Sequence, residues 1–366
     1  MSGDVYLHVG TAKSGTTYVQ RILAGNRNLL SRHQVLYPGE RTSHFLAAVD
    51  LRGTGFMGQE YPRARGAWND IVSEVRAFAG SALISSETLA KVRSELVRKA
   101  VDSFSGRDVR IVISCRDLAR QLPASWQETV KNRNVGTYDD YLAAVFNSWN
   151  GGRTTLRTVF WRIQNLIALA ERWAAVVGVE NVRLVTVPPA GAAPNTLWDR
   201  YRQATSLPDL DYRLDASVRN VSLGAAETEL LRRLNTYLPE DLSWPEYESR
   251  IKNRFVPREM FRGRSGGRLG VPDRYQQPTL QCAGQMIDAL RGAGYTVVGD
   301  LEELRPDFRS ATTLPDDIDT ERLLDLSLSV LASISSRQPH AARELSGKEA
   351  LGLLTGKLRR RLDPRR

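Results

Sequence analysis

The sequence contains few of the residues that cross-link small domains or bind metals. Its 366 residues include two cysteines, Cys115 and Cys282, and four scattered histidines. Two cysteines cannot build a disulfide framework, and so low a number is typical of a reducing compartment. Zinc sites need His and Cys ligands at short spacings, which these residues do not show. We therefore expect neither a metal site nor a disulfide-stabilised secreted fold.

Long apolar runs are also missing. No uninterrupted stretch approaches the ~18 apolar residues that a membrane span requires. The first five residues have neither a basic leader nor an apolar segment, so the sequence predicts no secretory signal. At 42% apolar and 25% charged residues, the composition is that of a globular chain and excludes a disordered or fibrous one. These features together predict a soluble, cytoplasmic protein.

Acidic residues are fewer than basic ones, and the excess of basic residues is unevenly distributed along the chain. The 51 basic residues exceed the 41 acidic ones by ten, and half of that excess lies in the last ten residues, 357–366. The rest of the chain is only modestly basic, which does not indicate a nucleic-acid partner but suits an anionic small molecule. The basic tail follows a segment with helical apolar spacing. It is interpreted either as a weak contact with an anionic membrane surface or an acidic partner, or as a solvated segment.

Short β-rich runs alternate with helical patterns along the chain. Strands are predicted at residues 4–9, 82–85, 109–114 and 182–187, and helices at 16–30, 68–78, 89–101 and within 138–173. This alternation predicts an α/β fold with a central parallel sheet flanked by helices. Ligands of such sheets bind beyond the carboxyl ends of the strands, here after Val9, Ser85 and Ser114. A linker-like stretch at 307–319 divides the chain into a domain at 1–306 and a helical, basic extension at 307–366.

A glycine-containing turn follows the first predicted strand. Residues 10–17 read Gly-Thr-Ala-Lys-Ser-Gly-Thr-Thr, and backbone N–H groups of such a turn form an anion site at the start of a helix. A nucleoside-triphosphate loop carries its lysine directly after the second glycine. Here Thr16 occupies that position and the lysine, Lys13, lies inside the loop. The pattern therefore favours a phosphate ligand other than ATP or GTP, and argues against a kinase; an ordinary turn is the alternative.

Residues 12–17, placed after a strand, resemble the 5′-phosphosulfate loop of sulfotransferases that use 3′-phosphoadenosine 5′-phosphosulfate (PAPS). The family's second signature is a strand that ends near an arginine, with a serine eight residues later. Residues 109–114, Arg116 and Ser125 resemble it, although Ser125 lies nine residues after Arg116. The pattern is most similar to that of bacterial members.

The resemblance implies a P-loop NTPase-like three-layer fold with helical insertions that bind an acceptor. It implies metal-independent, in-line transfer of a sulfuryl group from PAPS to a hydroxyl, less often an amine, of a small-molecule or glycan acceptor. 3′-Phosphoadenosine 5′-phosphate (PAP) is then the product. Lys13 would act in catalysis, and the nucleotide would be bound by Lys13, Ser14, Gly15, Thr16, Thr17, Arg116 and Ser125, with Arg264 and Arg268 in a loop that closes over the 3′-phosphate.

A general base must also take the acceptor's proton. The family places this base near the end of the strand that precedes the Arg116 strand, which here is Glu87; the alternative for Glu87 is a carboxylate that only stabilises a helix start. His44 is the second candidate, with an exposed surface histidine as its alternative. His8, inside the first strand, is interpreted as a sheet-packing residue. A catalytically silent nucleotide-binding protein remains the other functional interpretation, and the oligomeric state is not predicted.

Overall fold

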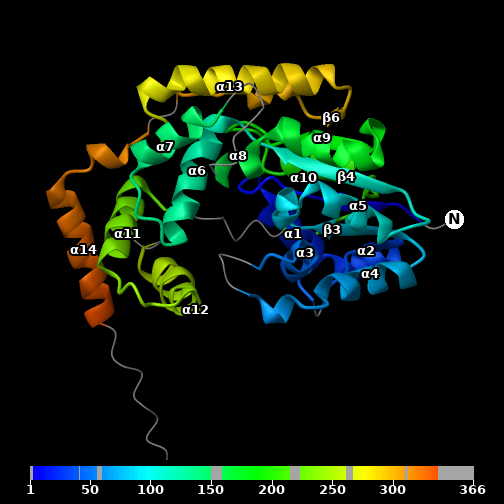
Figure 1. The fold of residues 1–366 in the computed structure, drawn as a ribbon, viewed down its shortest axis with the longest axis horizontal. Helices are drawn as coiled ribbons and strands as arrows, with labels where there is room; N and C mark the ends of the chain where they lie inside the picture. Colours follow the sequence, from blue (N-terminus) through cyan, green and yellow to red (C-terminus); the bar gives the residue numbers. More distant parts are fainter. Residues whose placement is uncertain are drawn as a thin grey trace, which may run out of the picture.

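The computed structural model describes residues 3–40, 42–55, 60–149, 159–214, 223–260, 267–309 and 312–336. Its centre is a six-stranded sheet in the order β2-β3-β1-β4-β5-β6, and every adjacent pair is parallel (Figure 1). The strands are β1 (Val5–His8), β2 (Val35–Leu36), β3 (Ser81–Ser85), β4 (Val109–Cys115), β5 (Val182–Thr186) and β6 (Thr296–Val298).

Alternating strand residues supply apolar side chains to both faces of the sheet, because successive side chains of a strand point to opposite sides. In β1, Val5 and Leu7 belong to one buried cluster and Tyr6 to the other. The Tyr6 face is covered by α1 (Thr16–Gly25), α2 (Arg27–Arg32) and α10 (Thr196–Ala204). The opposite face is covered by α3 (His44–Arg52), α4 (Ala67–Ala77), α5 (Ser94–Asp102), α9 (Leu166–Val177) and α13 (Asp273–Gly292). The predicted fold class, a parallel sheet between two helical layers, is confirmed.

The other helices form a second group, the helical lobe. It comprises α6 (Leu118–Lys131), α7 (Tyr138–Asn147), α11 (Ala225–Tyr237), α12 (Trp244–Tyr247), the π-helix η4 (Glu248–Met260) and α14 (Thr320–Ser335). Figure 1 shows this lobe on the side of the sheet away from the N-terminus, where β1 ends. Helix α8 (Val159–Gln164) lies near the junction of sheet and lobe. Short 3₁₀ helices are η1 (Pro62–Ala64), η2 (Glu87–Lys91), η3 (Val179–Asn181), η5 (Leu301–Leu304) and η6 (Pro315–Asp317).

The predicted elements differ from the observed ones mainly at their ends. The helix expected at 16–30 is two helices, because the chain turns at Asn26, whose side chain donates to the carbonyl of Ile22 at 2.8 Å. The segment expected as a helix at 89–101 is η2 followed by α5. Strands β2 and β6 were not predicted, since two and three residues are too few to show a pattern of alternation.

Helix α14 packs against α11 and η4, so this part of the predicted extension lies on the helical lobe. The division of the chain at residue 306 remains a prediction. The basic tail and the segment before it lie outside the described residues. Of the helices that the structure describes, none combines the length and apolarity needed to cross a bilayer.

Candidate functional site

The turn after β1 lies at the point where the strand order reverses, because β1 is flanked by β3 on one side and β4 on the other. Gly15 precedes α1 with φ +80°, and Lys13 also has a positive φ of +65°. The turn is tied to the next strand, since Thr11 N donates to Ser114 O at 2.9 Å. No side chain caps α1. The first N–H groups of the helix are therefore available to an anion.

Lys13 is paired with a carboxylate that the sequence did not single out. Its ammonium donates to Glu128 Oε2 at 2.6 Å, and the same carboxylate contacts Lys131 at 2.8 Å and Lys252 at 3.2 Å. Burial alone would raise the pKa of Glu128, but the three ammonium groups hold it well below its usual range. The three ammonium groups thus favour the charged form of Glu128, which binds Lys13 at the turn.

Arg116 directly follows β4 and reaches back to the turn. One terminal nitrogen, Nη1, donates to Lys13 O at 2.8 Å, and its buried Nε contacts no acceptor among the described residues. Burial lowers the pKa of Arg116 to about 10, with a further contribution from Arg120, so the group stays cationic near neutral pH. Asp117, the neighbour that might have neutralised it, is bonded by Arg120 instead. Arg116 therefore keeps donor capacity beside the turn.

One face of α6 packs toward the turn. Gln121 Nε2 donates to Ala12 O at 2.5 Å, and Gln164 of α8 donates to the same carbonyl at 3.0 Å. Ser125 lies one helical turn after Gln121 and is half-buried, so it stands on this face. Its contact with a 3′-phosphate stays a prediction. Neither glutamine was predicted, because nothing in the spacing of amides marks a loop contact.

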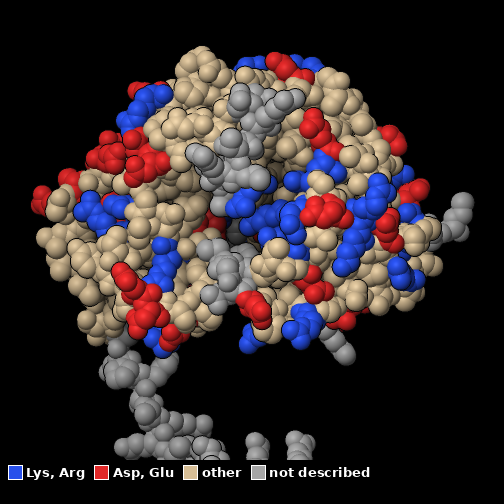
Figure 2. Space-filling view, in the orientation of Figure 1, with Lys and Arg blue, Asp and Glu red and all other residues tan. Residues whose placement is uncertain are grey.

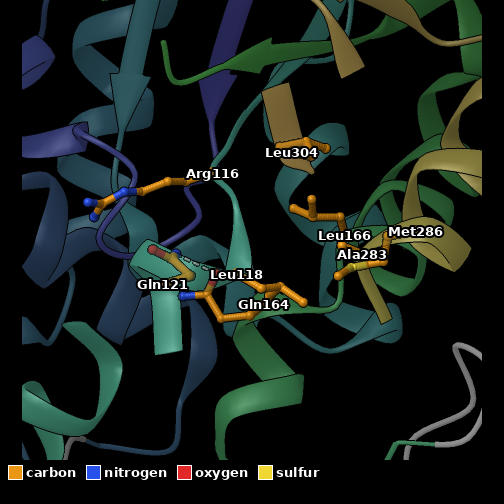
Figure 3. A pocket seen from close by; sticks show the side chains of 8 residues that line it. All are labelled: Arg116, Leu118, Gln121, Gln164, Leu166, Ala283, Met286 and Leu304. Carbon is orange, nitrogen blue, oxygen red and sulfur yellow. Dashed lines mark hydrogen bonds between the residues drawn. The ribbon is translucent and has the colours of Figure 1, made fainter. Parts of the chain in front are cut away.

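A small cavity lies beside these glutamines. Figure 3 shows the Arg116 guanidinium directed away from the apolar residues that line it, toward the turn. The cavity measures about 10 Å³, which is room for one water at most. It is a packing gap between α6, α9 and α13. Figure 2 shows a larger open hollow at the centre of this face of the molecule.

The other residues predicted to bind the nucleotide differ in their exposure. Ser14 is buried, and its hydroxyl donates to Thr11 O within the turn; Thr16 is buried at the start of α1, and Thr17 is partly exposed beside it. Arg268 is exposed, and its charge contributes to the lowered pKa of Arg116, which places the two in the same region. Arg264 lies outside the described residues.

Glu87 lies next to the turn on its other side. It begins η2 directly after β3, and a Cβ added to Gly10 would be 3.2 Å from both Glu87 Cα and Glu87 Cβ. Gln20 of α1 donates to Glu87 Oε2 at 3.3 Å. The side chain is partly exposed. The structure thus brings Glu87 and the turn that carries Lys13 together, as the sequence predicted for a base and a donor loop.

The interpretation of His44 as an exposed surface histidine is wrong, because only 7% of its surface is exposed. Both ring nitrogens are occupied. Ser85 N donates to Nδ1 at 3.1 Å, so the proton resides on Nε2, which lies 3.0 Å from Pro38 O. Burial lowers the pKa of His44 to about 4. The ring is therefore neutral near pH 7 and has no nitrogen left to accept a substrate proton.

The prediction that His8 packs within the sheet is confirmed. It is 1% exposed and lies between the neighbouring strands, with Nδ1 2.8 Å from Ser85 Oγ and Nε2 2.8 Å from Ser114 Oγ. Burial lowers its pKa to about 3. His8 thus connects the ends of β3, β1 and β4 directly below the turn.

Further cations lie near Glu87 that the sequence did not indicate. Burial lowers the pKa of Lys91, the charges of Arg52 and Arg162 lower it further, and Glu87 opposes them. Figure 2 shows lysine and arginine side chains gathered at the rim of the hollow. In the part of the chain that the structure describes, no group of three or more His, Cys, Asp or Glu side chains is arranged to hold a metal ion.

Comparison with known proteins gives little further information. No protein-family model matches the sequence, and no curated protein matches it. Among solved structures, the chain is similar to a sulfotransferase from Alicyclobacillus acidocaldarius, with 15% sequence identity and a TM-score of 0.39 over 68% of this chain and 96% of that one. At this sequence identity and TM-score, the similarity does not by itself indicate a function.

Proposed function

We propose that this chain is a sulfotransferase that transfers a sulfuryl group from PAPS to a hydroxyl, less often an amine, of a small-molecule or glycan acceptor. The observation that carries the proposal is the pairing of two anion sites at the end of β1. The uncapped turn with Lys13 forms one, and the Arg116 guanidinium, with its unpartnered Nε, forms the other. A ligand with phosphates at two positions of one ribose unit fits both sites, whereas a single triphosphate chain uses only the first.

The turn and Lys13 take the role of binding the donor's 5′-phosphosulfate. N–H groups at the start of α1, with Thr16 and Thr17, bind the phosphate, and Arg116 binds the 3′-phosphate through its planar donors. In the transfer step the acceptor oxygen attacks sulfur while the bond from sulfur to the bridging phosphate oxygen breaks. The electron pair of that bond goes to the oxygen, which leaves as part of PAP. Lys13, once released from Glu128, neutralises the charge that grows there.

Glu87 takes the role of the base. Its carboxylate is partly exposed, lies beside the turn and is held by Gln20, so it reaches the same reaction zone as Lys13. The acceptor's proton moves to a Glu87 oxygen as the new oxygen–sulfur bond forms, which conserves charge in the site. His44 is left out of this role because both of its nitrogens are engaged.

Binding measurements test the donor site. In calorimetry without added Mg²⁺, PAP should bind and ATP should not compete. Lys13→Met should weaken PAP binding by about tenfold or more, since one charge-assisted contact is lost. Lys99→Met, an exposed lysine on α5, is the matched control. Arg116→Gln should weaken PAP but leave 5′-AMP unchanged, because only PAP has the 3′-phosphate. If PAP does not bind, or ATP binds better, the proposal is wrong.

Turnover tests the base. With labelled PAPS and a cell extract as the source of acceptors, Glu87→Gln should lower the rate by about 10²-fold or more while PAP affinity is retained. Glu95→Gln, an exposed glutamate on α5, should be fully active. Binding of PAP without any product in the wild type would instead indicate the silent nucleotide-binding alternative.

A further inference from the structure

Three cations from three different elements lie together on the Glu87 side of the turn. Arg52 ends α3, Lys91 ends η2 and Arg162 belongs to α8, and both α3 and α8 pack against η2. The mutual effect of their charges, and of Glu87 on Lys91, shows that they share one region. We call Arg52, Lys91 and Arg162 the acceptor-side cluster.

Lys91 interacts with other residues, and Glu87 offsets part of its charge. Neither Arg52 nor Arg162 makes a hydrogen bond or an ion pair with any residue whose position the structure gives. Arg52 is half-buried, so water solvates it only in part, and burial and the nearby Arg162 both lower its pKa. Glu128, which also acts on Lys91, is already shared by three other ammonium groups. Arg52 and Arg162 therefore carry positive charge that a ligand anion would stabilise.

The strand order places Lys91 and Glu87 on the other side of the turn from Arg116, while α8 also contacts the turn through Gln164. Arg116 follows β4, whereas Glu87 and Lys91 follow β3, and β1 with its turn lies between those two strands. The donor's 3′-phosphate would therefore occupy the β4 side of the turn. An anion on Arg52 and Arg162 would be on the β3 side, where the acceptor approaches Glu87.

The spacing along η2 relates Glu87 to Lys91, one member of the cluster. Glu87 and Lys91 begin and end the same 3₁₀ helix, and four steps of about 2 Å separate their backbone positions by roughly 8 Å. Glu87 and one member of the cluster are thus neighbours on a single short element.

We propose that the acceptor carries an oxyanion, such as a carboxylate, sulfate or phosphate, which docks on Arg52 and Arg162 while the reacting hydroxyl lies at Glu87. This inference rests on the proposed function and specifies its substrate class. It distinguishes acidic glycans and acidic small molecules from neutral alcohols and phenols, which offer Arg52 and Arg162 no opposite charge.

The test measures binding to the PAP-loaded protein. The probes are monosaccharides and disaccharides that carry a uronate, a sulfate or a phosphate, each compared with its neutral counterpart. At least one anionic probe should bind about tenfold or more tightly than its neutral partner, and higher salt should reduce that preference. The double variant Arg52→Gln/Arg162→Gln should bind both members of the pair equally. Arg98→Gln, an exposed arginine of α5, should keep the wild-type preference.

Two results would overturn the inference. A third, the absence of PAP binding, concerns the donor site alone. If no anionic probe binds more tightly than its neutral counterpart, or if the double variant keeps the preference, the acceptor-side cluster is not the docking site. PAP titration of the same samples separates this outcome from failure of the proposed function. Normal PAP binding with no anion preference rejects only the acceptor class, whereas absence of PAP binding rejects the sulfotransferase proposal itself. The preferred probe among uronate, sulfate and phosphate identifies the oxyanion.

Discussion

Replacing Glu128 by glutamine should make the protein less stable and its donor site stronger. The substitution keeps the shape of the side chain but removes the charge that three ammonium groups share. At separations of 2.6–3.2 Å each pair has a Coulomb energy of about 5–6 kcal/mol at an effective dielectric constant near 20. Desolvation and solvent offset most of this energy, since the Glu128 side chain is 30% exposed. The net loss in the free energy of unfolding lies between that of a surface pair and that of a buried one, about 1–3 kcal/mol.

The effect on ligand binding has the opposite sign. Under the proposed function, Lys13 exchanges Glu128 for the donor phosphate. Removing the carboxylate removes the cost of that exchange and leaves Lys13, Lys131 and Lys252 without their shared carboxylate. A gain of about 1 kcal/mol corresponds to a PAP dissociation constant about fivefold lower. Calorimetric titration with PAP and urea unfolding measure the two effects. Glu95→Gln, which removes one exposed partner of Arg93, is the control and should change neither.

The pH dependence gives an independent check. Because the folded state holds the pKa of Glu128 below its ordinary value, the stabilisation is present above about pH 4.3 and is lost as pH falls through the lowered pKa. The stability difference between wild type and Glu128→Gln should therefore be constant from pH 5 to 8. A folded Glu128→Gln variant that binds PAP no better than wild type would refute the idea that this carboxylate competes with the donor for Lys13.

Two further predictions concern the floor and the rim of the site. His8 and His44 have pKa values lowered to about 3 and about 4, so the unfolded chain binds more protons than the folded protein below pH 6.5. The free energy of unfolding should therefore fall by about 2 kcal/mol for each histidine on going from pH 7 to pH 5. Urea unfolding of wild type and His44→Gln measures this fall, and an unchanged pH dependence in the variant would contradict it. Gly10→Ala should destabilise the protein by about 1–3 kcal/mol and slow turnover, because Gly10 has φ +108° and the new methyl group would press on Glu87; Gly25→Ala, whose added methyl group meets no atom within 4 Å, is the control.

The sequence was informative wherever a residue's role follows from its neighbours in the chain. The four predicted strands, the turn from Gly10 to Thr17 and the position of Glu87 after β3 all follow from local patterns of apolar residues and glycines. The parallel order of the strands then brings these segments to one edge of the sheet. Strands β2 and β6 escaped prediction because their pairing is decided by the rest of the sheet and not by their own residues.

The sequence was uninformative about contacts made across the fold. Glu128 lies 115 residues from Lys13, and its place in α6 looks like that of any surface glutamate. Arg52 and Arg162 are likewise unremarkable in their own helices, and only the packing of α3 and α8 on η2 brings them together. His44 follows the same rule in part, since one of its ring nitrogens accepts from Ser85 N, 41 residues away in the sequence.

The buried imidazole of His8 has one further consequence. A neutral ring has one nitrogen that donates and one that accepts, yet both contact serine hydroxyls at 2.8 Å. One serine must therefore give a proton to the ring while the other receives one, which orders the two hydroxyl dipoles in a single direction across three strands. The opposite ring tautomer, with both serine hydroxyl hydrogens rotated, would have the reverse direction at the same heavy-atom positions, so the base of the site is compatible with two electrostatic polarities in one geometry.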